Sequence, residues 1–521
     1  MSQTNPPDDF PVATDCIYMN GVDGTTGEYL TTPLDDGRRE LKQSVRFADI
    51  VDVIKGSAPP QQHAAHLSNV AHSLKQPHLG LPHYVDPLNI NEAGWGVVFP
   101  RSYGEDHPAR KALGPLLEHR ERQVGDSAKF KVLSYGDAAG RPEEWSDWLA
   151  RHSVSAGHVE PEKVPFYLLL VGSPEEMPFA FAHMLGLEYA VGSLHFDTPE
   201  EYAAYTESVL AYETGDSVPT ASEAVFFGPR HDQATKLSAD FLLDPLVGGV
   251  PGANRPPVVD QAFMETRKTL GTQAKRFKAR KVIGPRATKA ALLKTLRPPA
   301  GTKPPSLIFT ASHGMGFPSG HPDQSGSQGA LLCQDWPAVG SISPAHYLSG
   351  ADVPADARLH GVVTFHFACY GAGTPSHDRF IHKPGKQPPA IAPRPFVASL
   401  PKRLLAHPSG GALACIGHVE RAWGYSIVSN TSSPQLIPFE NAIGRILSGK
   451  PIGLAMKDFS DKYAALSAAL TGILEKASFG FKAPAEKLAR LWVERNDAEG
   501  YFVLGDPAVR LRVERIKPNG G

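Results

Sequence analysis

Apolar and polar positions alternate in blocks along the chain from about residue 94 onward. Short, almost wholly apolar runs are typical of strands that are covered on both faces, and three of them occupy residues 95–99, 130–134 and 166–172. Two longer stretches between these runs are predicted to be helices, at residues 108–123 and 142–151. Strands that alternate with helices of this length form parallel sheets through right-handed connections. We therefore expect a first α/β subdomain over residues 84–220.

A second series of the same kind extends toward the end of the chain. Its expected strands occupy residues 224–228, 281–284, 306–312, 361–368 and 410–419. Its expected helices lie at 237–246, 288–296, 452–474 and 485–494, and a further one has apolar positions at 439, 442, 443, 446 and 447. Two last apolar runs predict a hairpin at the edge of the sheet, at 502–504 and 509–513. The fold class that follows is α/β, with two subdomains of mainly parallel sheet flanked by helices and the second subdomain over residues 221–521.

The first 83 residues lack such a regular pattern. The hydrophobic period is mixed over residues 46–54, and a stretch with glycine and two prolines interrupts it at residues 56–62. We expect residues 1–83 to form an N-terminal extension that packs on the domain behind it.

Two of the expected strands end on a reactive side chain. The run 306–312 is followed by His313 and Gly314, and the run 361–368 is followed by Cys369. Because catalytic groups of parallel sheets lie just beyond the carboxyl ends of the strands, His313 and Cys369 should lie side by side if their strands are neighbours. An imidazole within reach can take the proton of a thiol and later protonate a leaving amine. The backbone N–H groups of Gly314 and Cys369 would then form an oxyanion hole.

A charged turn follows the expected strand 224–228 and should lie near the same cleft. It contains Arg230 and Asp232. Asp232 can orient His313, and Arg230 can bind substrate. The alternative interpretation of both residues is an exposed charged turn without a role in the site.

Further candidates for substrate binding lie between and after the two reactive residues. Asp335 is expected on the rim of the cleft, beside Trp336, and Asp378 follows Cys369 by nine positions (378 − 369). The stretch 383–395 contains five prolines, and such a long loop is either a substrate-binding or lid loop or only a stiff surface excursion. The sequence does not assign any of these residues to the subsite that selects the substrate.

The order and the surroundings of His313 and Cys369 resemble a known family. A strand ending in His-Gly, followed about 50 residues later by a strand ending in Ala-Cys-x-Gly, is the caspase-type arrangement, and the separation in this chain is 369 − 313 = 56. Other segments resemble the gingipain branch, namely 189–194 with a helix that ends at 213, then 410–419 and 504–507. Over roughly residues 165–512 the chain thus resembles caspase-fold (clan CD) cysteine peptidases, with gingipain-like and CHAT-type bacterial proteases the most similar. Phe367 stands where caspases have glutamine, so caspase substrate preference is not implied.

The resemblance implies a cysteine endopeptidase that hydrolyses peptide bonds through a Cys-His dyad and a thioester acyl-enzyme. It further implies limited proteolysis of a protein partner, such as a pore-forming effector, in a bacterial regulatory or defence system. The alternative hypothesis is a catalytically silent caspase-fold scaffold or binding protein. Neither a metal nor an organic cofactor takes part in the expected chemistry.

Composition places the chain among ordinary globular proteins and bears on which classes of partner it is expected to bind. Of its 521 residues, 41% are hydrophobic and 20% are charged, and the formal net charge is −2, which gives no reason to expect a nucleic-acid or membrane partner. No run approaches the 18 or so apolar residues that span a bilayer. Residues 1–12 show no secretory signal, so we expect a cytoplasmic protein.

Histidine and cysteine content raises one competing interpretation, a metal site. Four cysteines are too few for a disulfide framework and favour a reducing compartment, and Cys415 is expected to be a buried thiol without a role. Histidines and cysteines gather between residues 313 and 377, but no paired ligand spacing typical of zinc occurs there. His366 is interpreted as a core histidine.

Overall fold

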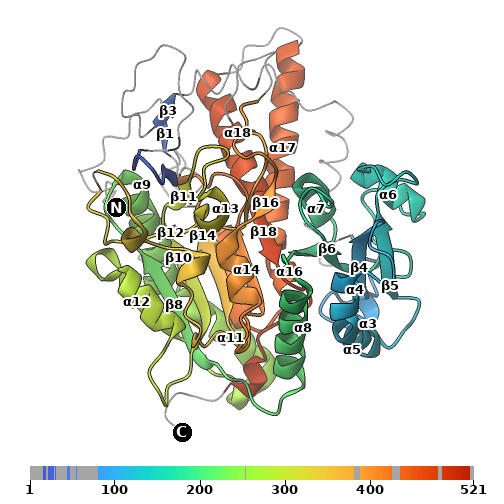
Figure 1. Ribbon diagram of the computed structural model, residues 1–521. Coiled ribbons are helices and arrows are strands. Elements are labelled where there is room, and N and C mark those ends of the chain that lie inside the picture. The colour runs from blue at the N-terminus through green and yellow to red at the C-terminus, as the bar shows by residue number, and fades with distance from the viewer. Residues whose placement is uncertain are drawn as a thin grey trace.

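A ten-stranded sheet flanked by helices runs through the protein (Figure 1). The computed structural model describes residues 16–18, 21–28, 30, 44–46, 54, 80–250, 252, 254–338, 340–380, 388–424, 427, 435–478 and 484–516. Eight of the ten strands correspond to the expected strands of the two series, a ninth to the apolar run at 502–504, and Ala190–Leu194 was not predicted as a strand. Most neighbouring strands are parallel. The expected fold class, a mixed α/β protein with a large, mainly parallel sheet, is confirmed.

The first series supplies one half of the sheet. In spatial order its parallel strands are β5 (Phe130–Tyr135), β4 (Trp95–Pro100), β6 (Tyr167–Val171) and β7 (Ala190–Leu194). Every residue of β4 and β6 is buried, which explains why these two runs are almost wholly apolar. The accompanying helices are α3 (Ile90–Ala93), α4 (Pro108–Ala112), α5 (Gly114–Val124), α6 (Trp145–Arg151), α7 (Phe179–Gly186) and α8 (Pro199–Thr214).

The second series supplies the other half, again with parallel strands. Their spatial order is β17 (Ala414–His418), β14 (Val363–Phe367), β10 (Pro305–Ala311), β8 (Ala221–Gly228) and β9 (Lys278–Ile283). Helices in this half are α9 (Gln233–Ser238), α10 (Asp244–Gly248), α11 (Val258–Leu270), α12 (Lys289–Leu296), α13 (Gln324–Ser327), α14 (Ser399–Leu405), α15 (Ile437–Leu447), α16 (Ile452–Ala455), α17 (Lys457–Ser478) and α18 (Ala485–Glu499).

The expected helices are present, with local differences. The stretch 108–123 is divided between α4 and α5 at Leu113, because Pro115 is tolerated only in the first turn of a new helix. Thr288 begins α12, and its side chain accepts a hydrogen bond from the backbone N–H of Ala291. Five helices, α3, α7, α11, α13 and α14, were not predicted. Glycines and prolines on either side of α11 obscure its buried side.

The last strand corrects the sequence prediction. Instead of an edge hairpin, β18 (Tyr501–Leu504) lies in the middle of the sheet, antiparallel to β17 and parallel to β7. Residues 509–512 form no strand, and Val513–Arg515 is a short 3-10 helix. A four-residue apolar run is compatible with a central strand as well as an edge strand, and its neighbours come from distant parts of the chain. With β18 in place, the two halves form one continuous sheet whose halves run in opposite directions.

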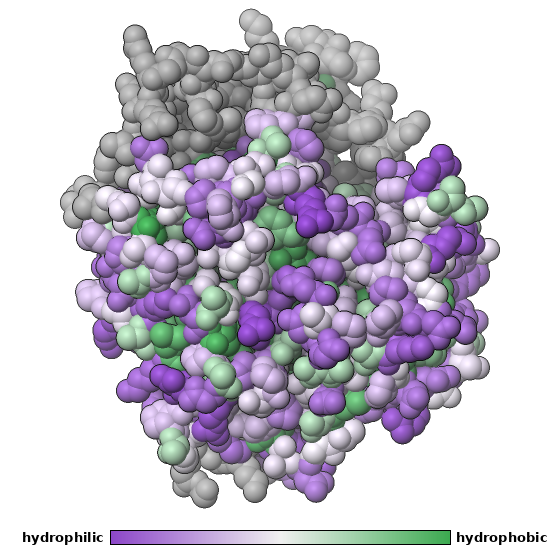
Figure 2. Space-filling model, in the orientation of Figure 1, coloured by the Kyte–Doolittle hydropathy of each residue, from purple (hydrophilic) through white to green (hydrophobic). Residues whose placement is uncertain are grey.

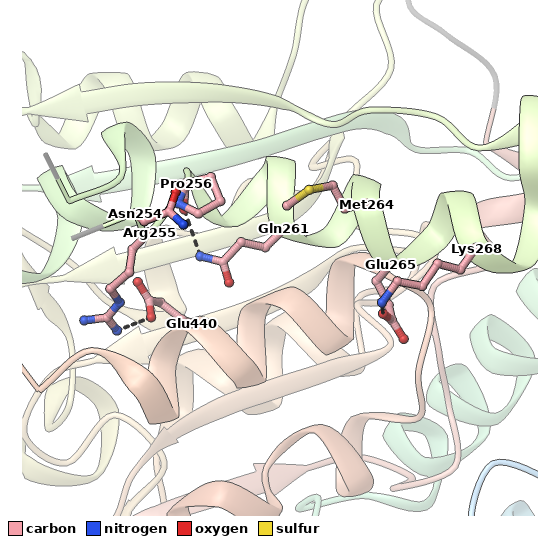
Figure 3. Close-up of a pocket in the computed structure, with 8 residues that line it drawn as sticks. All are labelled: Asn254, Arg255, Pro256, Gln261, Met264, Glu265, Lys268 and Glu440. Carbon is pink, nitrogen blue, oxygen red and sulfur yellow. Dashed lines mark hydrogen bonds and ion pairs between the residues drawn. The ribbon is translucent and has the colours of Figure 1, made fainter. Parts of the chain in front are cut away.

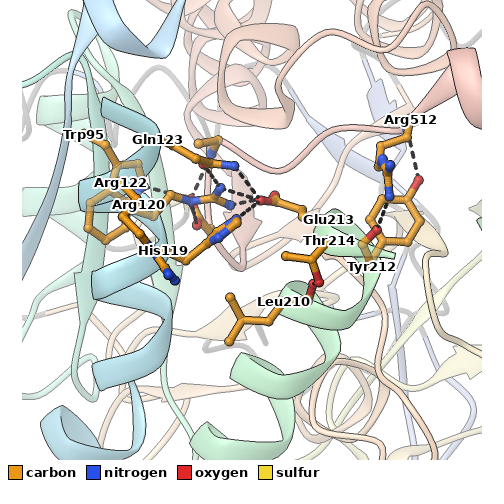
Figure 4. Close-up of polar contacts among 12 residues, drawn as sticks. Trp95, His119, Arg120, Arg122, Gln123, Leu210, Tyr212, Glu213, Thr214 and Arg512 are labelled. Atoms are coloured by element: carbon orange, nitrogen blue, oxygen red, sulfur yellow. Dashed lines mark hydrogen bonds and ion pairs between the residues drawn. The ribbon is translucent and has the colours of Figure 1, made fainter. Parts of the chain in front are cut away.

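Buried ion pairs hold the two halves together next to β18. Asp506 accepts hydrogen bonds from Trp95 Nε1 at 3.0 Å and from Arg120 Nε at 2.7 Å. The guanidinium of Arg120, from α5, also contacts Glu213 of α8 (Figure 4). Burial alone would raise the pKa of Glu213, but the charge of Arg120 and the hydrogen bonds to the carboxylate lower it to about 2. The Glu213 carboxylate is therefore ionised at neutral pH and paired with Arg120.

A small sheet lies beyond the carboxyl ends of the second half. Its order is β13 (Tyr347–Leu348), β12 (Leu331–Leu332), β11 (Gly314–Gly316) and β2 (Gly21–Asp23). Part of the N-terminal extension, β2, thus packs on the region that carries His313. A separate pair of short strands, β1 (Cys16–Tyr18) and β3 (Ser44–Arg46), also comes from this extension.

On the face that Figure 2 shows, the coloured residues are largely polar, and apolar ones appear mainly in the hollows between them. An open pocket of about 440 Å³ lies between α11 and α15, where Arg255 and Glu440 form an ion pair (Figure 3). None of the candidate residues named above lines this pocket. Within the part of the chain that the structure describes, no helix is both long and apolar enough to cross a bilayer.

Candidate active site

Neighbouring strands bring the two reactive residues to one edge of the sheet. Strands β10 and β14 are parallel and in register, with Ala311 opposite Phe367, and the backbone N–H of Ser312 donates to the Phe367 carbonyl at 3.1 Å. His313 lies two positions beyond Ala311 (313 − 311), and Cys369 lies two positions beyond Phe367 (369 − 367). The expectation that the two strands are neighbours is confirmed.

Cys369 occupies a tight turn at the end of β14. The N–H of Gly371 donates to the carbonyl of Ala368 at 3.2 Å, and Tyr370 has a φ of 59°. A positive φ at the third residue of a four-residue turn usually requires glycine, so a tyrosine there is an uncommon, strained choice of the kind found at functional sites. The turn fixes the direction in which Cys369 leaves the strand.

The thiol of Cys369 is buried and contacts backbone. Its Sγ accepts a hydrogen bond from the N–H of Ala422 at 3.2 Å, and the residue is 0% exposed. Burial raises the pKa of the thiol to about 12, despite the hydrogen bond from Ala422 and the nearby charge of Arg421, which both act to lower it. In the described arrangement Cys369 is therefore a protonated thiol at neutral pH, a weak nucleophile.

His313 contacts a carboxylate from the adjacent strand. Its Nε2 lies 2.5 Å from Oδ2 of Asp232, which is the residue that precedes α9. The other carboxylate oxygen accepts from the backbone N–H of Thr235 at 2.9 Å. Burial works to raise the pKa of Asp232, yet the charge and hydrogen bond of His313 and the bond from Thr235 hold that pKa well below its usual range. The charged turn after β8 is thus anchored on the candidate site by Asp232.

His231, the residue before Asp232, is also close to His313. The centroids of the two imidazole rings are 6.2 Å apart, and the His231 ring packs edge-on against Trp336 at 5.4 Å. Burial lowers the pKa of His231 to about 4. His231 is therefore neutral at physiological pH and adds no second positive charge beside His313.

Gly314 is required by close packing. A Cβ at this position would lie 1.8 Å from the carbonyl oxygen of Cys369 and 2.7 Å from its nitrogen. No side chain can be accommodated at such distances, so the segments after β10 and β14 touch backbone to backbone. This contact brings the two groups proposed for an oxyanion hole, Gly314 and Cys369, together.

Two of the remaining candidates, Arg230 and Asp335, have contacts with residues other than His313 and Cys369. Arg230 is half-exposed and pairs with Asp240 at 2.7 Å. Asp335 is exposed and accepts a hydrogen bond from the N–H of Lys289, at the start of α12, where a carboxylate stabilises the helix dipole. Each of these contacts is sufficient to explain the residue structurally.

Asp378, a candidate for substrate binding or for orienting the site, is almost fully buried. Its carboxylate pairs with Arg421 at 2.9 Å, and Arg421 also contacts the buried Glu420. Arg421 follows β17 and was missed by the sequence analysis. The signal was present, since Glu420 and Arg421 come directly after an apolar strand, but nothing in the sequence pairs them with Asp378.

Two other expectations concern the surroundings of the site. Of the proline-rich stretch, residues 383–387 lie outside the described residues, while Ala390 bridges His377. His366 is buried, and its Nδ1 lies 2.9 Å from the hydroxyl of Thr310, as expected for a core histidine. Among the residues that the structure describes, no group of three or more histidine, cysteine, aspartate or glutamate side chains is arranged to hold a metal ion.

Comparison with known proteins gives only distant similarity. No protein family and no curated protein matches the chain. The crystal structure of the Arg-specific cysteine proteinase gingipain R is 12% identical over 81% of this chain and 79% of that one, with a TM-score of 0.39. The complex of Porphyromonas gingivalis RgpB pro- and mature domains is 12% identical over 81% of this chain and 80% of that one, with a TM-score of 0.38. A Saccharomyces cerevisiae separase–securin complex is 10% identical over 89% of this chain but only 23% of that one, with a TM-score of 0.27. These values are too low to carry a conclusion about the activity of this chain.

Proposed function

We propose that the protein is a cysteine endopeptidase that uses Cys369 as nucleophile and His313 as general acid and base. The observation that carries the proposal is the register of β10 and β14, which puts His313 and Cys369 at the same level of two adjacent strand ends. The contact of His313 with Asp232 supports it further, because an imidazole held by a carboxylate is the usual partner of a nucleophile.

In the proposed reaction the thiol proton passes to His313, and Sγ of Cys369 attacks the carbonyl carbon of a peptide bond. The backbone N–H groups of Gly314 and Cys369 hold the oxyanion. The C–N bond breaks as His313 donates its proton to the departing amine, which leaves a thioester on Cys369. Water then attacks the thioester while His313 takes a proton, and a free carboxyl group and the thiol result. Asp232 is the positioning residue, since it contacts His313 and not the substrate.

A protein partner is the substrate that we infer, cut at one or a few places. This step rests on the resemblance of the sequence to gingipain-like and CHAT-type proteases, for which an effector such as a pore-forming protein in a bacterial regulatory or defence system is one expected target.

A peptide library tests the proposed activity. The wild-type chain should cleave a subset of peptides, and the Cys369→Ala variant should lose at least about 10³-fold in kcat/KM, as expected when a nucleophile is removed. Cys415→Ala is the matched control, because Cys415 is an equally buried thiol in the neighbouring strand β17, and it should stay within about twofold of wild type. Equal turnover by wild type and Cys369→Ala would refute the assignment.

A second candidate function is a scaffold or binding protein that keeps this fold without turnover. The observation that favours it is that His313 and Cys369 are both 0% exposed. If no library peptide is cleaved by any form in which Cys369 has become reactive toward small electrophiles, the scaffold is the better account.

A further inference from the structure

The strand β2 is seated on the edge of β11, directly beside the candidate site. The two strands are parallel, with Gly21 opposite Gly314 and Val22 opposite Met315. The N–H of Gly24 donates to the carbonyl of Gly316 at 2.6 Å. Val22 is fully buried in a cluster that includes Met315. This part of the N-terminal extension is thus a built contact rather than a loose tail.

Gly21 lies against the thiol itself. A Cβ at position 21 would be 2.8 Å from Sγ of Cys369 and 3.1 Å from its Cβ. Only glycine fits at such a distance, so the backbone of residue 21 fills the space in front of the sulfur. A substrate carbonyl would have to enter that same space to be attacked.

Leu30 closes the same region from a second direction. Its N–H donates to the carbonyl of Gly21 at 3.2 Å, so the segment folds back on itself. Its own carbonyl accepts a hydrogen bond from Nε of Arg421 at 3.1 Å. The Leu30 side chain packs against a cluster that contains Phe380 and Trp423. Backbone and side chain of Leu30 are therefore both held by residues that surround Cys369.

Strand β2 pairs with the edge of β11 in the way that a bound extended peptide would. Extended peptides bind proteins by adding a strand to a free sheet edge, with side-chain pockets for specificity. The edge of β11 begins at Gly314, whose backbone touches Cys369. In this structure β2 occupies that edge, and a carbonyl of the same segment takes up a donor of Arg421.

We infer that residues 21–28 and 30, the cover segment, close the substrate cleft from within the chain, and that the protein cleaves peptides only while this segment is displaced. The inference rests on the proposed peptidase function and names its regulation. With the cover segment in place, a substrate can reach neither Cys369 nor the β11 edge. Departure of the segment would open both at once and return Cys369 to water.

A disulfide trap in the full-length chain tests the contact. In the Gly21→Cys variant the introduced Cβ is within a few tenths of an ångström of the spacing found in disulfides. Treatment with diamide, an azodicarboxamide that takes up two electrons and two protons from two thiols, should join position 21 to Cys369. Gly104→Cys is the control, because Gly104 is exposed and a Cβ there meets nothing within 4 Å. Peptide mapping without reductant should find the bond to Cys369 in the first variant only; its absence there would overturn the inference.

A larger side chain at position 21 tests whether the cover segment protects Cys369. In Gly21→Val the added side chain collides with Cys369, so the cover segment should be displaced and iodoacetamide should alkylate Cys369 at least tenfold faster than in wild type. Gly104→Val should alkylate at the wild-type rate. Cys333 and Cys415, both buried, report on folding and should remain unmodified. A Gly21→Val chain with protected Cys333 and Cys415 and an unchanged rate at Cys369 would contradict the cover.

The two experiments separate the inference from the proposed function. If Gly21→Val misfolds, Cys333 and Cys415 become reactive as well, and the disulfide trap then decides alone. If Cys369 becomes reactive in Gly21→Val but no peptide is cleaved, the cover segment stands and the peptidase fails. If wild type cleaves peptides as fast as Gly21→Val, the peptidase stands and the cover fails.

Discussion

The two halves of the ten-stranded sheet are built alike, but their strands run in opposite directions. Strands β4, β5, β6 and β7 of the first half are parallel to β18, and β18 is antiparallel to β17 at the start of the second half. The carboxyl ends of the two halves therefore emerge at opposite edges. Chemistry in parallel sheets gathers at carboxyl ends, and the edge of the second half carries the thiol of Cys369 next to the strand end that carries His313 and its partner Asp232.

Interactions beyond the strand ends show the same difference. After β8, β10 and β14 the chain places Asp232 against His313 and puts Cys369 at the end of the neighbouring strand. In the first half, a buried group of polar contacts lies around Arg120, which pairs with Glu213 and with Asp506 beyond β18. The comparison teaches that one half supplies the candidate site and that the other, through β18, completes the sheet that supports it.

Removing the imidazole is the sharpest way to test this division. We expect His313→Ala to lower kcat/KM by about 10²- to 10⁴-fold, the usual contribution of general acid and base catalysis. His366→Ala is the matched control for loss of a buried histidine in the neighbouring strand, and it should lower stability more than it lowers the turnover of folded protein. Steady-state kinetics on both folded variants distinguishes them. A normal kcat/KM for His313→Ala would contradict a catalytic site in the second half of the sheet.

Breaking the contact between the halves should act on stability instead. Arg120→Leu leaves Glu213 and Asp506 buried without their cation, and loss of one partner from such a pair costs about 3–5 kcal/mol in the free energy of unfolding. Arg122→Leu, on the exposed side of the same helix, should change it by about 0.5 kcal/mol or less. Denaturant titration measures both values. A small effect of Arg120→Leu would mean that the halves are held together mainly elsewhere.

Removing the carboxylate of Asp232, which contacts His313, should have the smallest effect on the measured constants. Asp232→Asn is expected to lower kcat by about 10- to 100-fold with little change in KM, as is common for residues that position a functional group. Asp106→Asn, at a nearly fully exposed aspartate, is the control and should leave both constants unchanged. A rise in KM with normal kcat would instead indicate that Asp232 binds substrate.

The same variant gives a pH test with a defined sign. Because the pKa of Asp232 is lowered in the folded protein, its contribution to stability is fully present above the unfolded pKa of about 4 and is lost as the pH falls through the lower folded pKa. The difference in unfolding free energy between wild type and Asp232→Asn should therefore be constant at neutral pH and shrink below about pH 4. A difference that stays constant down to pH 2 would contradict a lowered pKa of Asp232 in the folded protein.

Most of the strands, and the adjacency of the two strand ends that carry His313 and Cys369, were predictable because both follow from local patterns. A short apolar run between glycines and prolines predicts a strand, and the reactive residue after it predicts the edge. The cap at Thr288 was predictable for the same reason. The assignment of catalytic roles to His313, Cys369 and Gly314 stays a proposal, as does the division of the chain near residue 220.

What the sequence could not predict depends on contacts between distant segments. The central place of β18 requires knowledge that β17 and β7 both accept Tyr501–Leu504. The burial of Asp378 depends on Arg421, 43 positions further along the chain (421 − 378). Gly21 lies 348 positions before the thiol that it covers (369 − 21). No periodicity or spacing rule joins such pairs, so the site was predictable as a pair of residues but not as a closed cleft.

The most direct test of the proposed site is site mapping with a pool of peptides that carry a thiol-reactive acyloxymethyl ketone, applied to the wild-type chain and to Gly21→Val. The account predicts one dominant adduct, on Cys369, which forms faster in Gly21→Val and is lost when His313→Ala is added. Preferential modification of Cys333 or Cys415, or a Cys369 adduct that forms equally well without His313, would contradict a peptidase site at the ends of β10 and β14.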